Sequence, residues 1–306
     1  MKVFVPMLAA HAGIRDQDLL EKDVRLHLLL DELARDASVG PDLIFKGGTC
    51  LIKCYLDYPR FSTDLDFTWR PRDALDSLGT KALRRALRPV QRGFLERLSG
   101  HAAAQGLRFD SERDVQFGQS NRMMTVLLRY ESVARLPGLV KMQVNFTEPL
   151  LYSTKRVEAH GLLKGDLPGA LRLLDSDLPK RYARAVQAEA YDPREILAEK
   201  CRAILTRQAT KAKDLLDLYL IEKDLGFRVE DHLDAVRRKV QFSAERTERY
   251  RRHVAAPGER FKALLEEDVR PLLLREIDLG GFEAYRRRIL GVLAAQGRAL
   301  RETRGL

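Results

Sequence analysis

The segment from Phe45 to Phe67, FKGGTCLIKCYLDYPRFSTDLDF, constrains the fold and chemistry of this chain more than any other. Two adjacent glycines follow a short apolar run over 43–45, which predicts a buried strand, and the residues after them predict a helix over 49–56. Glycine lets the backbone approach a ligand closely, and the first turn of a helix presents unpaired N–H groups and a positive dipole end. This arrangement predicts a phosphate-binding turn.

Two aspartates lie just downstream, where polar and apolar residues alternate. The run from Asp64 to Trp69 has the period-two pattern of a half-buried strand, so Asp64 and Asp66 point to the same face. Two carboxylates side by side repel each other unless a cation lies between them, and their hard oxygens suit Mg²⁺ shared with substrate phosphates. The pattern indicates phosphoryl or nucleotidyl transfer. The alternative, left open by spacing alone, is the solvated face of an edge strand.

The order of the expected elements indicates an α+β chain in two parts. A helix is expected over 16–35, a long helical stretch over 74–105, and further helices over 230–240, 260–274 and 282–301 within a C-terminal part that is helical from Pro193 onward. Strands are expected over 107–109, 122–130, 139–146, 156–160 and 186–191. We therefore expect a mixed α+β domain of residues 1–191 and an all-helical domain of residues 192–306.

Composition narrows the classes of protein that this chain can be. Its 306 residues are 32% charged and 45% hydrophobic, an ordinary globular balance. No run approaches the roughly 18 apolar residues of a membrane helix, and His11 and Arg15 interrupt the N-terminal apolar run, so we expect a cytoplasmic protein without a signal peptide. The three cysteines have no metal-ligand spacing, which predicts reduced thiols and no zinc site.

The net charge of +10 favours encounter with polyanions, and nucleic acid is the commonest one in a cytoplasm. Basic residues gather at 180–184, 237–239, 246–252 and 286–288. The aromatic residues interleaved with them could stack on bases: Tyr182, Phe242, Tyr250 and Tyr285. Acidic residues are mixed in, so a solvated helix face explains each cluster singly about as well.

Four blocks of this sequence resemble a known family. They are Glu21-Lys22-Asp23, the run from Phe45 to Thr49 followed by RFSTDLD at 60–66, the helix 195–207, and the segment 213–218. In order and spacing, from about Leu19 to about Leu220, they are similar to the AbiEii/AbiGii toxin family, which includes the MenT-type toxins. That family belongs to the DNA polymerase β-like nucleotidyltransferase superfamily. The resemblance implies a nucleotidyltransferase mixed sheet with helices, followed by the all-helical domain.

The resemblance assigns roles to the residues of the first blocks. Gly47, Gly48 and Thr49 would hold the triphosphate of an incoming NTP. Asp64 and Asp66 would be catalytic and would bind the cofactor Mg²⁺, which lowers the barrier to attack at the α-phosphorus.

The later blocks supply the other implied site residues. Lys200 and Arg207, seven apart on one predicted helix face, would meet the triphosphate and neutralise the leaving pyrophosphate. Asp214 would orient that lysine or the nucleotide. Without the resemblance, a solvated helix face explains Lys200 and Arg207. Arg60 and Ser62 flank the metal strand and could contact phosphate, although packing and turn roles explain them equally well.

One departure from the superfamily pattern concerns the metal site. Many polymerase β-like enzymes carry a third carboxylate on a later strand, and its place here is the face of Lys141, Gln143 and Asn145, which holds no acid. Either two carboxylates suffice or the third comes from elsewhere. No general base for the attacking hydroxyl can be named.

The resemblance implies a Mg²⁺-dependent toxin of a toxin–antitoxin system. It would transfer NMP from an NTP to an RNA acceptor, the 3′ end of tRNA, with release of pyrophosphate, and a cognate antitoxin protein would neutralise it. The alternatives are a nucleotidyltransferase that acts on a protein or a small molecule, a non-catalytic RNA-binding module that keeps the fold, and a kinase-type use of the same site.

Overall fold

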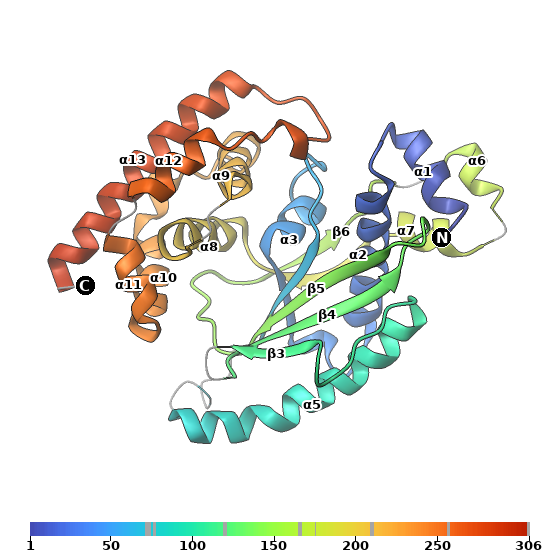
Figure 1. Ribbon diagram of the computed structural model, residues 1–306, viewed down its shortest axis with the longest axis horizontal. Coiled ribbons are helices and arrows are strands. Elements are labelled where there is room, and N and C mark those ends of the chain that lie inside the picture. The colour runs from blue at the N-terminus through green and yellow to red at the C-terminus, as the bar shows by residue number, and fades with distance from the viewer. Residues whose placement is uncertain are drawn as a thin grey trace. The chain divides into compact units, whose positions relative to one another are not determined.

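A computed structural model describes residues 1–70, 75, 78–118, 121–164, 167–174, 176–208, 211–255 and 258–304 (Figure 1). The chain divides into two compact units. Unit 1 comprises Met1–Leu150 and Thr154–Ala190, and unit 2 comprises Leu151–Ser153 and Tyr191–Leu306. The domain boundary expected at 191/192 stays a prediction, because it implies independent folding of the two parts.

Unit 1 is built on a mixed sheet that has seven strands within the described residues, in the order β3-β4-β5-β2-β1-β7-β6. The strands are β1 (Leu43–Lys46), β2 (Asp64–Trp69), β3 (Val115–Gly118), β4 (Met123–Glu131), β5 (Pro137–Asn145), β6 (Lys155–Ala159) and β7 (Val186–Ala190). At the centre, β2 pairs antiparallel with β1 and parallel with β5.

Alternation of buried and exposed residues explains these strands. Met124, Val126 and Leu128 of β4 are buried and lie opposite the buried Val144 and Met142, among others, of β5. Helix α2 (Gln17–Arg35) packs against β2, β5 and β7. Helix α5 (Thr80–Ala104) packs beside it (Figure 1), with the ring of Phe94 at 6.1 Å from that of Trp69.

The described residues of unit 1 also form shorter helices. They are α1 (Phe4–Ala12), the 3-10 turn η1 (Gly40–Asp42), α3 (Gly47–Cys54), α6 (Gly169–Arg172) and α7 (Leu178–Ala183). Helices α1, α6 and α7 share an apolar cluster with α2 that buries Phe4, Leu8, Leu20, Leu171 and Tyr182. This cluster explains the N-terminal apolar run, for which no helix was predicted.

Unit 2 is helical over its described residues, apart from short connections. It contains α8 (Pro193–Thr206), α9 (Ala212–Leu225), η2 (Val229–His232), α10 (Leu233–Arg246), α11 (Glu248–Ala255), α12 (Gly258–Glu266), η3 (Arg270–Leu272) and α13 (Leu279–Arg304). Asp192 caps α8 by accepting a hydrogen bond from the Arg194 N–H. Helix α8 contacts α9, α10, α11 and α13. None of the helices described for either unit is long and apolar enough to cross a membrane.

The α+β fold class is confirmed, with local differences. The short strand β3 was not predicted, and the strand expected over 107–109 is only an isolated bridge between Arg108 and Arg129. The helix expected over 260–274 ends at Glu266, five residues before Pro271, which cannot donate a backbone hydrogen bond. The start expected at 74 for the long helix lies outside the described residues.

Candidate functional site

The turn between β1 and α3 has the form expected of a phosphate-binding turn. Gly47 has φ 79°, in the left-handed region that favours glycine. A Cβ on Gly47 would lie 2.6 Å from Asp66 Oδ2, so no larger residue fits beside that carboxylate. Lys46, at the N-cap of α3, provides no side-chain cap. The backbone of Gly47 and Gly48 therefore begins the helix next to Asp66, in the geometry in which helix N-termini bind anions.

The two aspartates share one face at the centre of the sheet. Asp66 lies opposite Lys46 of β1 and Gln143 of β5, and Asp64 lies opposite Lys141. Both aspartates are partly exposed. The edge-strand alternative is wrong, because β2 lies between β1 and β5. Two carboxylates open to solvent on one face, beside an anion-binding turn, fit a Mg²⁺ ion that takes its other ligands from phosphate and water.

Lys141 of β5 lies on the strand face where a third carboxylate was expected. Lys141 Nζ lies 3.3 Å from Asp64 Oδ2, with both side chains about one third exposed. Solvent screens such a pair, so it is weak and easily exchanged for another cation. Over the described ranges no group of three or more His, Cys, Asp or Glu side chains could hold a metal. Within that part of the chain, no third acidic ligand joins Asp64 and Asp66, and their binding of a metal stays a prediction.

Thr49 and Ser62 join α3 to the start of β2. The buried Thr49 hydroxyl donates a hydrogen bond to the carbonyl of Asp64 and lies 2.8 Å from Ser62 Oγ. Arg60 is only 2% exposed, and its Nη1 donates to the Phe61 carbonyl at 2.7 Å. These contacts favour positioning and packing roles for Thr49 and Arg60. Contact of either side chain with phosphate stays a prediction.

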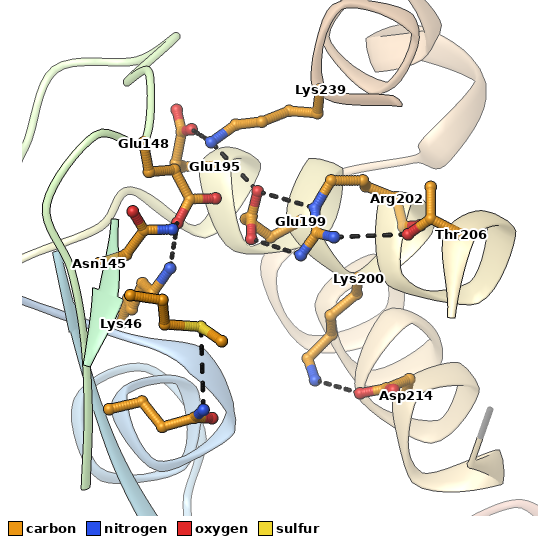
Figure 2. A network of polar contacts seen from close by, with 12 residues as sticks. Lys46, Asn145, Glu148, Glu195, Glu199, Lys200, Arg202, Thr206, Asp214 and Lys239 are labelled. Atoms are coloured by element: carbon orange, nitrogen blue, oxygen red, sulfur yellow. Dashed lines mark hydrogen bonds and ion pairs between the residues drawn. The ribbon is translucent and has the colours of Figure 1, made fainter. Parts of the chain in front are cut away.

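A partly buried ion pair lies beside the same turn. Lys46 Nζ pairs with the Glu148 carboxylate, which also accepts a hydrogen bond from Asn145 Nδ2 at 3.1 Å (Figure 2). Glu148 follows β5 by three residues, and sequence reasoning missed it. The only sign of Glu148 in the sequence is its place just after β5, the strand on which a third acid was expected. The pair holds the Lys46 side chain at the N-cap of α3.

A second buried network fixes α3 to α2 and explains Asp23 of the Glu21-Lys22-Asp23 block. Lys53 Nζ lies 2.8 Å from Asp23 Oδ1, and Tyr182 Oη donates to Asp23 Oδ2 at 2.7 Å. Burial, with the Asp23 charge close by, raises the pKa of Tyr58 and of Tyr182 well above the usual range, so both phenols stay protonated. Asp23 and Lys53 therefore hold α3, which begins at the Gly47–Gly48 turn, against α2.

In unit 2, Lys200 is held between two aspartates of α9. Its Nζ lies 2.9 Å from Asp214 Oδ1 and 2.5 Å from Asp217 Oδ2 (Figure 2 shows the first contact). The Lys200 side chain is 8% exposed and that of Asp217 is fully buried, so a solvated helix face is wrong for Lys200. Burial raises the pKa of Asp214, but Lys200 and, more weakly, Arg207 outweigh it and hold this pKa below its ordinary value.

Asp217 was not among the predicted site residues, although it lies three residues after Asp214 and thus on the same side of α9. Arg207 is not on a helix face with Lys200, because α8 ends at Thr206 and Arg207 is its exposed, extended C-cap. The guanidinium of Arg260 ends the helix by donating to the carbonyls of Ile204, Leu205, Arg207 and His253.

Internal contacts use much of the basic charge that sequence reasoning assigned to RNA. Arg184 pairs with Asp31 at 2.6 Å, Lys239 with Glu195 at 2.6 Å, and Arg288 with Glu222 at 2.6 Å. Tyr182 and Tyr285 are buried, so the expectation that these rings stack on bases is wrong. The clusters at 180–184 and 286–288 therefore contribute more to the fold than to any polyanion surface.

A separate cavity of about 330 Å³ lies in unit 1, lined by Phe45, Phe67 and the end of α2 among others. None of the predicted site residues lines it. Phe45 and Phe67 point to the opposite face of the sheet from Asp64 and Asp66. The predicted chemistry therefore belongs to the open carboxylate face and not to this cavity.

Comparison with known proteins agrees with the fold and identifies the family. A sequence model of a family described as nucleotidyl transferase AbiEii toxin, type IV TA system, matches residues 28–301. Among solved structures, the chain is similar to MenT4, a nucleotidyltransferase toxin from Mycobacterium tuberculosis H37Rv, with a TM-score of 0.54 and 22% identity over 97% of this chain and 92% of that chain. No curated protein sequence matches the chain. The likeness to MenT4 shows a shared fold.

Proposed function

The chain belongs to the AbiEii family of nucleotidyl transferase toxins of type IV toxin–antitoxin systems, and from this premise we propose that it transfers NMP from an NTP to the 3′ end of tRNA with the help of Mg²⁺. Family membership makes the protein a toxin nucleotidyltransferase with an NTP as substrate and an antitoxin as partner. The metal, the acceptor and the roles of individual residues are the proposal.

The observation that supports this chemistry most is the contact between the turn and the carboxylates. Asp66 lies against Gly47 at the start of α3, and Asp64 shares its face. A cation held by these two carboxylates would adjoin phosphates bound at the helix N-terminus. Bound Mg²⁺ would supply Lewis-acid stabilisation of charge on the phosphates.

The proposed reaction is an in-line displacement at the α-phosphorus. The acceptor hydroxyl oxygen forms a bond to that phosphorus, the bond from it to the bridging oxygen breaks, and pyrophosphate leaves with the bridging oxygen. The hydroxyl proton passes to water. Gly47 and Gly48 would bind the triphosphate through their backbone, and Thr49 and Ser62 would hold the start of β2 in place.

Lys200 would meet the triphosphate and balance the charge that develops on the leaving pyrophosphate. Its two ion pairs hold the ammonium in one orientation before any ligand binds. Asp214 and Asp217 would therefore be positioning residues for Lys200. Arg207, exposed at the end of α8, would add a second positive charge for the phosphates.

The test is transfer of label from nucleotides labelled at the α-phosphate. Purified protein is incubated with Mg²⁺, total tRNA and each of the four NTPs in turn, and Asp64→Ala serves as the inactive control. We expect label on tRNA with wild type alone. Label that stays free with all four nucleotides, or that Asp64→Ala transfers equally well, would overturn the proposal. Label on a protein or on a small molecule would identify a different acceptor.

A further inference from the structure

The N-terminal half of α5 carries a dense row of cations without any acid. Between Thr80 and Phe94 the chain has five basic residues and no Asp or Glu. All five are exposed: Lys81, Arg84, Arg85, Arg88 and Arg92. No other helix of unit 1 presents such a row over the residues described.

Packing fixes the direction in which this row points. Leu83, Leu87, Gln91 and Phe94 are buried on the opposite side of α5. Gln91 Nε2 also donates to the Asn121 carbonyl at 2.8 Å, which sets the rotation of the helix. At a rise of about 1.5 Å per residue, the cations from 81 to 92 extend over about 16 Å of helix. They form one stripe that faces solvent.

The stripe differs from the other basic clusters in its partners. Arg184 and Arg288 form close ion pairs with carboxylates of neighbouring elements. In the stripe, Arg92 lies 3.9 Å from Glu96, and no carboxylate within the described part of the chain pairs with the four cations before it. Like charges spaced three and four residues apart on a helix repel each other, so this arrangement costs stability until an anion binds.

The face that carries the stripe is suited to a phosphate backbone. Its exposed residues from 80 to 92 are Thr80, the five cations and Pro89. It offers no aromatic ring for stacking on bases, so it reads no sequence. It also lacks the exposed apolar and aromatic side chains that form the centre of most protein–protein interfaces. Arginine binds phosphate with two parallel hydrogen bonds, and such contacts are independent of base sequence.

We propose that Lys81, Arg84, Arg85 and Arg88 form a phosphate-binding stripe that holds the backbone of the RNA acceptor. The proposal rests on the proposed function, because that function supplies the RNA. The proposal assigns to this surface of unit 1 the binding of RNA phosphates that are not part of the reacting nucleotide. RNA binding can be measured without catalysis, so the stripe is tested separately from the transfer reaction.

The experiment compares two variants that each remove four positive charges. The stripe variant is Lys81→Gln/Arg84→Gln/Arg85→Gln/Arg88→Gln, and glutamine is a good helix former. The control variant is Arg113→Gln/Arg237→Gln/Arg270→Gln/Arg275→Gln, whose arginines are exposed and paired with Asp110, Asp234, Asp268 and Asp224. Both variants have a net charge of +6, which is +10 less four. The affinity for labelled tRNA is measured by fluorescence anisotropy over a range of salt concentrations.

We expect the stripe variant to bind tRNA at least about tenfold more weakly at physiological salt, and the slope of log K against log salt to fall by about three to four. The control variant is expected to stay within about twofold of wild type, because its cations are already neutralised. A third variant, Arg84→Lys/Arg85→Lys/Arg88→Lys, keeps the charge and should keep the slope, which separates lost charge from a damaged fold.

Unchanged tRNA affinity and slope in the stripe variant would overturn the proposal. So would an equal loss in stripe and control variants, since net charge alone would then explain it. If the stripe variant keeps tRNA binding but loses binding to the antitoxin, the stripe is a protein-docking surface and the proposal is wrong. If wild type binds tRNA through the stripe but transfers no label, the stripe stands and the proposed acceptor reaction fails.

Discussion

Asp64 and Asp66 of unit 1 and Lys200 of unit 2 lie in opposite environments. In unit 1, Asp64 and Asp66 are partly open to solvent, and the lysine beside Asp64 is a weak partner. In unit 2, Lys200 is almost buried and bonded to two aspartates. In the proposed reaction, the open carboxylates exchange their weak lysine partner for a metal ion that also contacts the nucleotide. The buried lysine is fixed in place and is part of the fold. Removing a carboxylate from the face of β2 should therefore lower activity alone. Removing Lys200 should lower both activity and stability.

The largest effect is expected for the open carboxylates. Asp64→Ala should lower the rate of transfer by at least about a thousandfold, equivalent to about 4 kcal/mol, because the metal loses a ligand. The melting temperature should stay close to that of wild type, since a repulsive neighbour of Asp66 is removed. The control Asp57→Asn changes an exposed carboxylate paired with Lys164 and should leave the rate unchanged. A melting temperature far below wild type would contradict the difference between the units.

The buried lysine should show both effects. Lys200→Ala leaves two buried carboxylates without their cation, so the free energy of unfolding should fall by about 3 kcal/mol and transfer should be lost. Neutralising the partners as well, in Lys200→Ala/Asp214→Asn/Asp217→Asn, should recover much of the stability but none of the activity. Chemical denaturation and the labelling assay measure the two quantities. Full stability of the single variant would show that Lys200 lies in a solvated environment.

The turn itself can be tested at Gly47. Gly47→Ala forces a Cβ into the left-handed region and against Asp66, which should cost about 1–3 kcal/mol of stability and disturb the carboxylate. Gly100→Ala is the matched control, because α5 has open space there and alanine is the better helix former by about 1 kcal/mol. Equal stability and activity for the two variants would contradict the close approach of Gly47 and Asp66.

The buried, neutral imidazole of His27 in unit 1 should set part of the pH dependence of stability. Burial, helped by the Lys53 charge, lowers the pKa of His27 from 6.5 to about 3. The unfolded chain therefore binds the proton first, and stability should fall by about 1.4 kcal/mol per pH unit as the pH drops below 6.5. In His27→Gln that slope should disappear, whereas the exposed His11→Gln should keep it. Chemical denaturation of wild type and of both variants at pH 7 and at pH 5 measures the change in the free energy of unfolding.

The smallest effect concerns the weak partner of Asp64. Lys141→Gln removes a cation that competes with the metal, so binding of Mn²⁺ should tighten by about two- to fivefold, as expected for a solvent-screened pair. Weaker Mn²⁺ binding in this variant would show that Lys141 supports the metal site instead of competing for it.

Local patterns in the sequence predicted the strands, turns and helices that depend on residues close together in the chain. The alternation around Asp64 and Asp66, the glycine pair and the helical stripe after Pro193 each lie within a few residues, and the structure places these elements as expected. The roles of the site residues stay predictions. The family resemblance, and not spacing, singled out Lys200.

What the sequence did not reveal depends on contacts between distant residues. Arg184 and Asp31 are 153 residues apart, so nothing near 180–184 showed that this cluster was already neutralised. Lys46 and Glu148 are 102 residues apart, and only the sheet brings them together. The cations of the α5 stripe are close together in the sequence, but only the structure shows that they share one exposed face and that no carboxylate among the described residues pairs with the first four.

Metal binding by the open carboxylates tests the central claim most directly. Mn²⁺ is titrated into the protein with and without an NTP, and free Mn²⁺ is followed by electron paramagnetic resonance. Wild type should bind Mn²⁺ more tightly when the NTP is present, and Asp64→Ala/Asp66→Ala should bind it at least about tenfold more weakly, a change of about 1.4 kcal/mol. Equal Mn²⁺ binding by wild type and by this variant would contradict the assignment of the metal to the face of β2.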